Sequence, residues 1–325
     1  MMRLQECNGR SALANLRSAM DGRPAFCLHL EGNGPPPMRA AVLPLMRSIL
    51  CHACLLLALV ISTTALRAAA QPTTRRWTID GVTREAMVYV PESAKTQPSP
   101  VIFAFHGRGG KMQGAAKLAF ESAWPEAIVV YPQALKTPGL VADLEGKQFA
   151  WQCKPGMADD RDLKFFDAML DSVEKDYRVD PDRIYATGHS NGGQFAYLLW
   201  QTRGDKIAAF SPAAAALAPV ILNPDANNVT VAVKTPRPIL IIAGQHDSDH
   251  FVWQERSIEI VRRINHCGDG EPWDGTNHRT LYPSPDGAPV IAYIHPGGHA
   301  LPPDASAVII KFFKQFPKPA AHSAQ

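Results

Sequence analysis

A serine with a glycine two positions away on either side is the side chain best placed for chemistry in this sequence. Ser190 is the centre of Gly188-His189-Ser190-Asn191-Gly192, a short string that can also occur by chance. Its surroundings make it informative, because the apolar run 184–187 precedes it and the segment 194–199 has helical character. A tight strand-turn-helix connection exposes a serine as a nucleophile and needs glycines where strand and helix approach. We therefore predict that Ser190 is a nucleophile, the alternative being a glycine turn with a helix-capping serine.

A serine hydroxyl becomes a strong nucleophile only when a base takes its proton and an acid orients that base. In chains with this type of turn, the acid and then the histidine follow the serine. Asp247 follows the apolar run 239–243, and His299 follows the apolar run 290–294. Asp249 is the alternative acid, but its position suits a cap for a helix that starts near residue 250. We therefore predict a triad of Ser190, His299 and Asp247.

The same chemistry needs donors for the negative oxygen of a tetrahedral intermediate. Two backbone N–H groups are predicted to supply them: that of Asn191, and that of Arg108 in the loop His106-Gly107-Arg108-Gly109-Gly110. The Arg108 side chain would then be free to meet the substrate. The alternative for this loop is a plain glycine turn. The predicted chemistry requires no metal and no cofactor.

Three further residues are candidates for substrate binding: Gly107, Trp151 and His189. For Trp151, core packing is an equally good interpretation, and for His189 so is hydrogen bonding beside the motif. His295 lies at a strand end beside a proline, which favours a structural role.

Strands and helices must bring these distant residues together. A hairpin is predicted around Asp80-Gly81, since Asp-Gly suits a tight turn. Apolar runs typical of buried strands are 101–105, 127–131, 183–187, 207–210, 239–243 and 290–294, and helical spacing marks 160–177, 194–200, 251–264 and 305–316. This alternation predicts the α/β class, with a mostly parallel central sheet flanked by helices and the site at the carboxyl ends of its strands. No large cap domain is expected, and 213–238 is the place for a small lid or long loop.

The N-terminal part has the pattern of a leader. A cleaved signal peptide typically has a basic start, an apolar centre and small residues before the cleavage site. This pattern is formed by Met46-Arg47, an apolar run over 49–66, and Ala68 and Ala70 before Gln71. We therefore expect an extension over 1–45, a signal peptide over 46–70 and one catalytic domain over 71–325, secreted to the periplasm or the extracellular space. An uncleaved membrane anchor is the alternative, although the run is slightly short for one. No stable membrane insertion is expected after cleavage.

Charge and cysteine content narrow the function classes. Residues 1–70 hold seven arginines and three acidic residues, so the formal charge of +3 for the chain becomes −1 for the remainder. A near-neutral domain without a basic cluster does not fit nucleic-acid binding and favours a neutral or weakly polar substrate. Cys153 and Cys267 remain after the leader, and an oxidising compartment would permit them to pair. The sequence leaves that pairing open.

Together these motifs resemble the secreted esterases grouped with polyhydroxybutyrate depolymerases and feruloyl esterases, including those called LpqC-like. The resemblance covers most of residues 71–325 and is carried by the segments 106–110, 161–166, 182–193 and 297–299. It implies an α/β-hydrolase fold, the triad named above, and an ester of a hydroxyalkanoate, an aromatic acid or an acetylated polysaccharide. The depolymerase branch usually has Cys in place of Arg108, and the family often has Trp after the catalytic His, where this chain has Leu301 two places on. Both departures weigh against polymer depolymerisation more than against ester cleavage.

The sequence thus predicts a secreted serine carboxylic-ester hydrolase that acts on a small-molecule or polymeric ester. A peptidase or an acyltransferase could use the same triad. An alternative of another class is an inactive glycan- or wall-binding module. A binding module has no need of Ser190, Asp247 and His299 in this order, which favours the enzyme.

Overall fold

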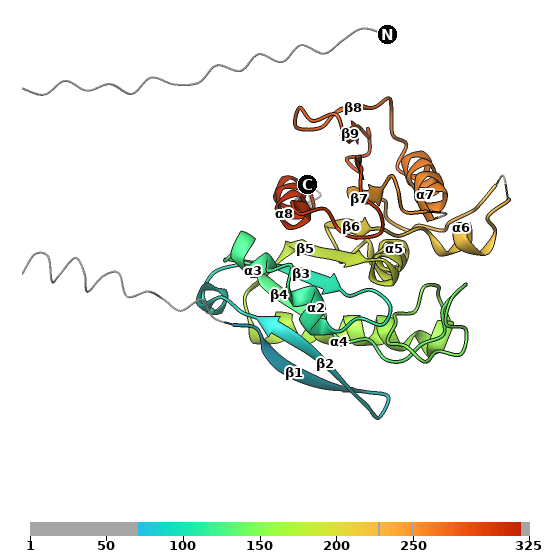
Figure 1. Ribbon diagram of the computed structural model, residues 1–325. Coiled ribbons are helices and arrows are strands. Elements are labelled where there is room, and N and C mark those ends of the chain that lie inside the picture. The colour runs from blue at the N-terminus through green and yellow to red at the C-terminus, as the bar shows by residue number, and fades with distance from the viewer. Residues whose placement is uncertain (1–70, 227, 249, 320–325) are drawn as a thin grey trace, which may run out of the picture. The chain divides into compact units, whose positions relative to one another are not determined.

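The computed structural model describes residues 71–226, 228–248 and 250–319. The predicted extension, the predicted signal peptide and Asp249 lie outside these ranges. One ten-stranded sheet forms the centre of the domain, in the order β1-β2-β4-β3-β5-β6-β7-β10-β9-β8 (Figure 1). The strands are β1 (Thr73–Ile79), β2 (Val82–Tyr89), β3 (Ser99–Phe105), β4 (Ile128–Pro132), β5 (Val179–His189), β6 (Ala209–Ala213), β7 (Ile239–Gly244), β8 (Glu271–Pro272), β9 (Arg279–Tyr282) and β10 (Val290–His295).

The six central strands, from β4 through β10, pair in parallel, and the pairs at either edge of the sheet are antiparallel. This confirms the predicted mostly parallel sheet. The predicted hairpin is β1 and β2, whose turn residues Asp80 and Gly81 both have positive φ angles, 49° and 79°. The Asp-Gly pair forms this turn because such angles cost these residues little.

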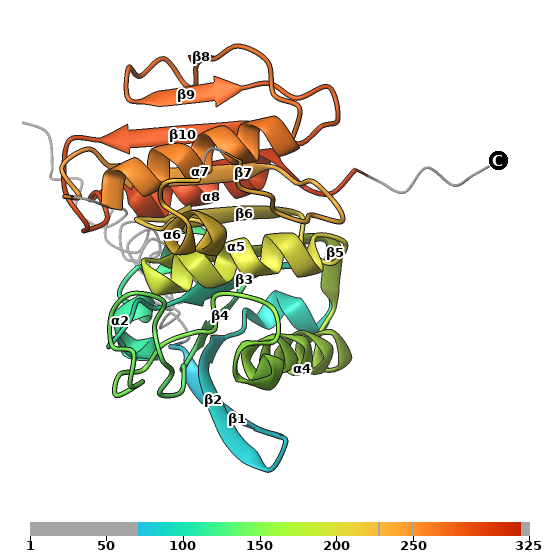
Figure 2. The same cartoon turned by 90° about the vertical axis from the view of Figure 1, so that its right-hand side faces the viewer.

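Helices cover both faces of the sheet. They are η1 (Glu92–Lys95), α2 (Met112–Ala116), α3 (Phe120–Ala123), η2 (Met157–Asp160), α4 (Arg161–Asp176), α5 (Asn191–Arg203), α6 (Ala218–Leu222), α7 (His250–Ile264) and α8 (Ala305–Gln315). Figure 2 looks onto the face covered by α4, α5 and α7. The opposite face packs against α2, α3 and α8.

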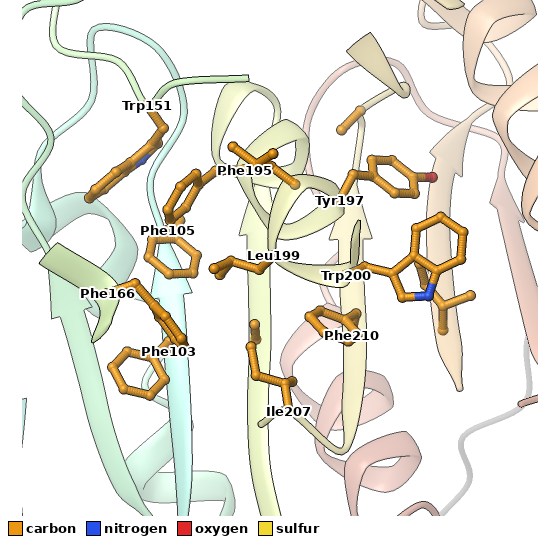
Figure 3. Packing of buried hydrophobic residues seen from close by; sticks show 14 of the residues in the cluster. Phe103, Phe105, Trp151, Phe166, Phe195, Tyr197, Leu199, Trp200, Ile207 and Phe210 are labelled. Atoms are coloured by element: carbon orange, nitrogen blue, oxygen red, sulfur yellow. The ribbon is translucent and has the colours of Figure 1, made fainter. Parts of the chain in front are cut away.

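Two cores follow from this layering. Phe103 and Phe105 of β3 point into the core under α4 and α5, whereas Ile102 and Ala104 of the same strand point into the other core. Alternate residues reach opposite faces, so a strand covered on both sides must be apolar throughout. Figure 3 shows the first core, where aromatic side chains from β3, α4 and α5 meet. This buried packing holds the strand ends that carry the candidate site.

Sequence and structure differ at some element boundaries. β6 starts two residues later than predicted and runs to Ala213, and α5 starts at Asn191, directly after the candidate nucleophile. The sequence did not predict the short elements α2, α3, α6, β8 and β9. They contain too few residues for the periodic spacing of apolar residues to be recognised. Within 213–238, the residues that the structure describes form no cap domain and include α6. Among the described residues, no helix combines the length and apolar character that crossing a bilayer requires.

Candidate active site

Ser190 lies at the sharp bend between β5 and α5. Its backbone has φ 55° and ψ −121°, an unfavourable conformation for a residue with a side chain. A Cβ atom on Gly188 would overlap the Gly192 backbone, and one on Gly192 would overlap the Phe105 carbonyl. Both positions therefore require glycine. The Ser190 N–H donates to Ala213 O of the neighbouring strand at 2.8 Å, which holds the bend in place.

The structure brings together the three residues predicted as a triad. His299 Nε2 lies 2.8 Å from Ser190 Oγ, and His299 Nδ1 lies 2.8 Å from Asp247 Oδ2. Asp247 follows β7 and His299 follows β10, two neighbouring parallel strands. Nδ1–H can donate only to the carboxylate in this arrangement, which leaves Nε2 free to accept the serine proton. The geometry is that of a nucleophile, a base and an orienting acid.

Asp247 is held by a residue that sequence analysis missed. Asp247 is buried, and its Oδ2 also accepts a 2.6 Å hydrogen bond from Gln254 Nε2 of α7. Two donors on one oxygen fix the carboxylate in the orientation that His299 requires. A sequence pattern could have identified Gln254. It lies four residues after His250, and this spacing places both side chains on one face of α7.

The loop that carries His299 is fixed from two sides. His189 Nε2 donates to the His299 carbonyl at 2.6 Å, and the His246 N–H donates to Gly297 O at 2.9 Å. Burial lowers the pKa of His189, which keeps this ring neutral beside His299. His295 accepts a hydrogen bond from the Gly297 N–H at Nδ1, consistent with a structural role. His189 thus orients the base loop and is not among the residues that line the cavity described below.

The other half of the site is built around Trp151. Its main chain pairs with the Asn191 side chain, since the Trp151 N–H donates to Asn191 Oδ1 at 2.6 Å and Asn191 Nδ2 donates to Trp151 O at 3.1 Å. The indole Nε1–H donates to the His106 carbonyl at 2.9 Å. Trp151 therefore joins the two segments predicted to form the oxyanion hole. It is fully buried against Phe105 and Phe195, so the structure favours core packing over contact with substrate.

His106 completes this buried arrangement. Its Nδ1–H donates to Gly107 O at 2.7 Å, and its Nε2 accepts the Ala134 N–H at 3.1 Å. The ring must be neutral to accept that bond, and burial accordingly lowers its pKa. Gly107 lies closely behind Ser190, where a Cβ atom would be 3.3 Å from the Ser190 Cβ. Gly107 therefore packs closely against Ser190 and is not a lining residue of the cavity.

The Arg108 side chain is not free, contrary to expectation. Its Nη1 donates to Thr137 O at 3.0 Å and lies 3.2 Å from Asp143 Oδ2. Asp143 in turn accepts the N–H groups of Lys147 and Gln148, which lowers the pKa of its carboxyl. Arg108 and Asp143 thus fasten the loop 137–148, named the flap below, beside the site. The prediction failed because Arg108 pairs with an acid 35 residues away, and no local sequence pattern reveals such a pair.

The two cysteines that follow the predicted leader are both free. Cys153 is buried behind the nucleophile turn, where its Sγ contacts Asn191 Nδ2 at 3.1 Å and Gln194 Oε1 at 3.0 Å. Burial raises the pKa of this thiol to about 12, so it remains protonated and unreactive. Cys267 lies beyond the end of α7. The disulfide that the sequence left open is not formed.

A cavity of about 150 Å³ opens directly at Ser190. Its walls come from the flap, the segment after β6, and α6 and α7. The lining residues are Arg108, Leu140, Val141, Ala142, Ser190, Asn191, Gln194, Ala214, Ala215, Ala216, Ile221, His250, Trp253, Gln254 and His299. Most of these were not predicted, because loops remote in sequence supply them. The walls are largely apolar, with the polar groups gathered around Ser190.

Three donor side chains at this site could also hold a metal ion. The carboxylate of Asp247 and the imidazoles of His250 and His299 each offer a ligand atom, and these atoms lie within 4.8 Å of one another. Two of the three belong to the hydrogen-bonded chain that ends at Ser190.

Comparison with known proteins agrees with the geometry. A family model described as putative esterase matches residues 81–271, more than half of the chain and including Ser190 and Asp247. The putative esterase NocK of Nocardia uniformis is 29% identical over 187 residues, which is 55% of this chain and 50% of that protein. Feruloyl esterase B of Piromyces equi is 28% identical over 203 residues, 55% of this chain and 37% of that protein. The matched region thus spans half or less of these curated relatives.

Solved structures show the same fold. The acetyl xylan esterase of Aspergillus awamori superposes with a TM-score of 0.54 at 13% identity, covering 74% of this chain and 99% of that one. The fold is therefore that of the α/β-hydrolases. The chain belongs to the putative esterase family, a family of carboxylic-ester hydrolases.

Proposed function

We propose that the protein is a serine carboxylic-ester hydrolase that works through Ser190, His299 and Asp247. The observation that carries this proposal is the chain of two 2.8 Å contacts from Ser190 Oγ through the His299 ring to Asp247. The family membership supports the same class of reaction. A peptidase, an acyltransferase or a binding module has no comparable support.

The reaction proceeds in two acyl-transfer steps. Ser190 Oγ attacks the ester carbonyl while His299 Nε2 takes its proton, and the resulting imidazolium is stabilised by Asp247. His299 then returns the proton to the leaving alcohol as the tetrahedral intermediate collapses to an acyl-enzyme. Water, deprotonated by His299, attacks the acyl-enzyme and releases the acid with Ser190 restored. No net proton or electron is gained by the protein.

The negative oxygen formed in each step needs donors that are already in place. We assign this role to the backbone N–H groups of Asn191 and Arg108. Asn191 begins α5, where the helix dipole also favours negative charge. The contacts of Trp151 with Asn191 and His106 hold both donor segments, so neither has to reorganise during the reaction.

The cavity suggests a small or single-ring acyl group. A volume of about 150 Å³ is comparable to that of engineered protein cavities that bind benzene. The apolar wall from Leu140, Ile221 and Trp253 suits an acetyl, short hydroxyalkanoate or feruloyl-type group better than a charged one. The relatives named as feruloyl and acetylxylan esterases support this class of ester, either as a small molecule or as part of a polymer.

We further propose that the domain is exported and cleaved before Gln71. This proposal rests on the sequence pattern of residues 46–70, which lie outside the described part of the chain. N-terminal sequencing of protein recovered outside the cytoplasm tests it. An N-terminus at Gln71 supports cleavage there, and recovery of the uncleaved chain in membranes contradicts it.

Replacement of the nucleophile tests the main proposal. Ser190→Ala should reduce kcat for p-nitrophenyl acetate by at least about 10⁴-fold, because the covalent route is lost. Circular dichroism should show an unchanged fold. Ser122→Ala, at an exposed serine of α3, is the matched control and should retain full activity. Hydrolysis by Ser190→Ala at the wild-type rate would refute the mechanism.

A further inference from the structure

A second histidine faces the acid of the triad. His250 Nδ1 lies 3.5 Å from Asp247 Oδ1, whereas His299 Nδ1 lies 2.8 Å from Oδ2. The two imidazoles therefore share one carboxylate, one at each oxygen. Serine hydrolysis requires only the His299 contact, so the proposed mechanism gives His250 no role.

Local structure fixes His250 in this position. It is the first residue of α7, and its N–H donates to the Asp247 carbonyl at 3.0 Å, which links the start of this helix to the acid. Its ring lies 5.6 Å from the His299 ring and 5.4 Å from the Trp253 ring, measured between centroids. The side chain therefore stays beside the triad although it is 53 % exposed.

The burial of the three groups suits a cation. The side chain of Asp247 is only 3 % exposed, whereas the side chains of His250 and His299 are 53 % and 44 % exposed. An ion could approach from solvent along the two imidazoles and meet a desolvated negative charge beneath them. Coulombic attraction is stronger there than at an open surface.

The donor set is typical of zinc and related ions. Two imidazole nitrogens and one carboxylate oxygen are common ligands of Zn²⁺, at about 2.0–2.2 Å from the metal. In a tetrahedral site such donors stand roughly 3.3 Å apart. The ligand atoms of the three residues lie within 4.8 Å of one another. The two imidazoles contact different oxygens of Asp247, at 3.5 Å and 2.8 Å. Side-chain rotation would therefore have to bring one carboxylate oxygen and both nitrogens to the tetrahedral spacing. Water can occupy the fourth position because both imidazoles are open to solvent.

We propose that Asp247, His250 and His299 form an inhibitory site for Zn²⁺ or a similar divalent ion. This inference concerns regulation of the active site and rests on the proposed function. A metal on His299 Nδ1 occupies the nitrogen that otherwise donates its proton to Asp247. The ring would then carry its single proton on Nε2 and could not accept the proton of Ser190. The metal-bound and hydrolytic states are therefore mutually exclusive.

Binding can be measured without catalysis. In Ser190→Ala all three metal ligands are retained, so titration with zinc chloride by calorimetry should show binding of one ion. Ser190→Ala with His250→Ala should bind at least about tenfold more weakly, since a ligand is lost. His278, an exposed histidine beside β9, supplies the matched control, and Ser190→Ala with His278→Ala should bind Zn²⁺ unchanged. Equal affinity with and without His250 would overturn the site.

Inhibition is measured on the wild-type enzyme. Zinc chloride should stop hydrolysis of p-nitrophenyl acetate, EDTA should restore it, and magnesium chloride should have no effect because Mg²⁺ prefers oxygen ligands. In His250→Ala, the zinc concentration for half inhibition, relative to that variant's own metal-free rate, should rise at least about tenfold. A zinc-saturated enzyme that hydrolyses at the metal-free rate would overturn the inhibitory role. Zinc binding by a protein that cleaves no ester would instead retain the site and refute the proposed function.

Discussion

The two halves of the candidate active site, which meet at Ser190, differ in burial and in bonding. On one side, Trp151, His106 and Asn191 are at most 4 % exposed and are joined through hydrogen bonds to main-chain groups. On the other side, Asp247 is buried but the side chains of His299 and His250 are about half exposed. We call these the oxyanion half and the acid-base half.

The difference follows from what each half does in the proposed mechanism. Donors for an oxyanion contribute most when they are fixed in advance in a desolvated place, which explains the dense packing around Trp151. A general base must exchange protons with the substrate and with water, so its ring must reach solvent. That same exposure leaves the acid-base half open to a metal ion, whereas the oxyanion half offers no such entry.

The largest effect is expected in the acid-base half. Asp247→Asn should lower kcat by about 10⁴-fold, because an amide no longer holds His299 in the tautomer that accepts the serine proton. Steady-state hydrolysis of p-nitrophenyl acetate measures the loss. Asp249→Asn is the control, since Asp249 was the alternative acid in the sequence. If Asp249→Asn loses more activity than Asp247→Asn, the assignment of the acid is wrong.

A smaller effect is expected in the oxyanion half. Trp151→Phe keeps a buried ring but removes the indole N–H that holds the His106 carbonyl. We expect kcat to fall about tenfold to a hundredfold with KM nearly unchanged. The backbone donors would be held less firmly, and they stabilise the transition state more than the bound substrate. Trp200→Phe, at another fully buried tryptophan of the same core, controls for loss of indole packing. An equal loss of kcat in both variants would assign Trp151 a packing role alone.

The flap should affect binding more than chemistry. Asp143→Asn removes the charge that pairs with Arg108, which loosens the wall formed by Leu140, Val141 and Ala142. KM for aromatic esters should rise a few fold, with a smaller change in kcat. The exposed Glu145 of the same flap provides the control variant Glu145→Gln, which should leave KM unchanged. A fall in kcat alone would show that the flap acts on the oxyanion donors.

The smallest effect concerns stability and pH. Because burial lowers the pKa of His106, the folded protein takes up this proton less readily than the unfolded chain. Stability should be complete above about pH 6.5 and should fall as the pH drops below that value. His106→Phe should be less stable at neutral pH, and its melting temperature should change less between about pH 7 and pH 5. An unchanged slope would show that other groups, such as His189, set the acid sensitivity.

The main features of the fold could be predicted from the sequence. Apolar runs such as 101–105 and 239–243 indicated strands covered on both faces, and these are β3 and β7. The turn at Ser190 could be recognised because its glycines are required by contacts within a few residues. Asp247 and His299 could be selected because the acid and then the histidine follow the serine in chains with this turn, and because both residues follow strands whose carboxyl ends meet at one edge of the sheet.

Other features of the site required the tertiary structure. Three contacts of the site join residues that are far apart in the sequence. Arg108 pairs with Asp143, 35 positions away, and Asn191 pairs with Trp151, 40 positions away. The rings of His250 and His299 lie side by side although they are 49 positions apart. The sequence therefore left the Arg108 side chain free and Trp151 open to two interpretations.

The sequence by itself thus determined the fold class, the nucleophile turn and the order of the candidate triad, because each depends on local pattern or on strand order. Only the tertiary structure decided the cavity walls, the buried support of Asn191 by Trp151, and the second histidine at Asp247. The physical reason is that hydrogen bonds and ion pairs depend on distances of a few ångströms between side chains. Those distances are set by packing of the whole domain.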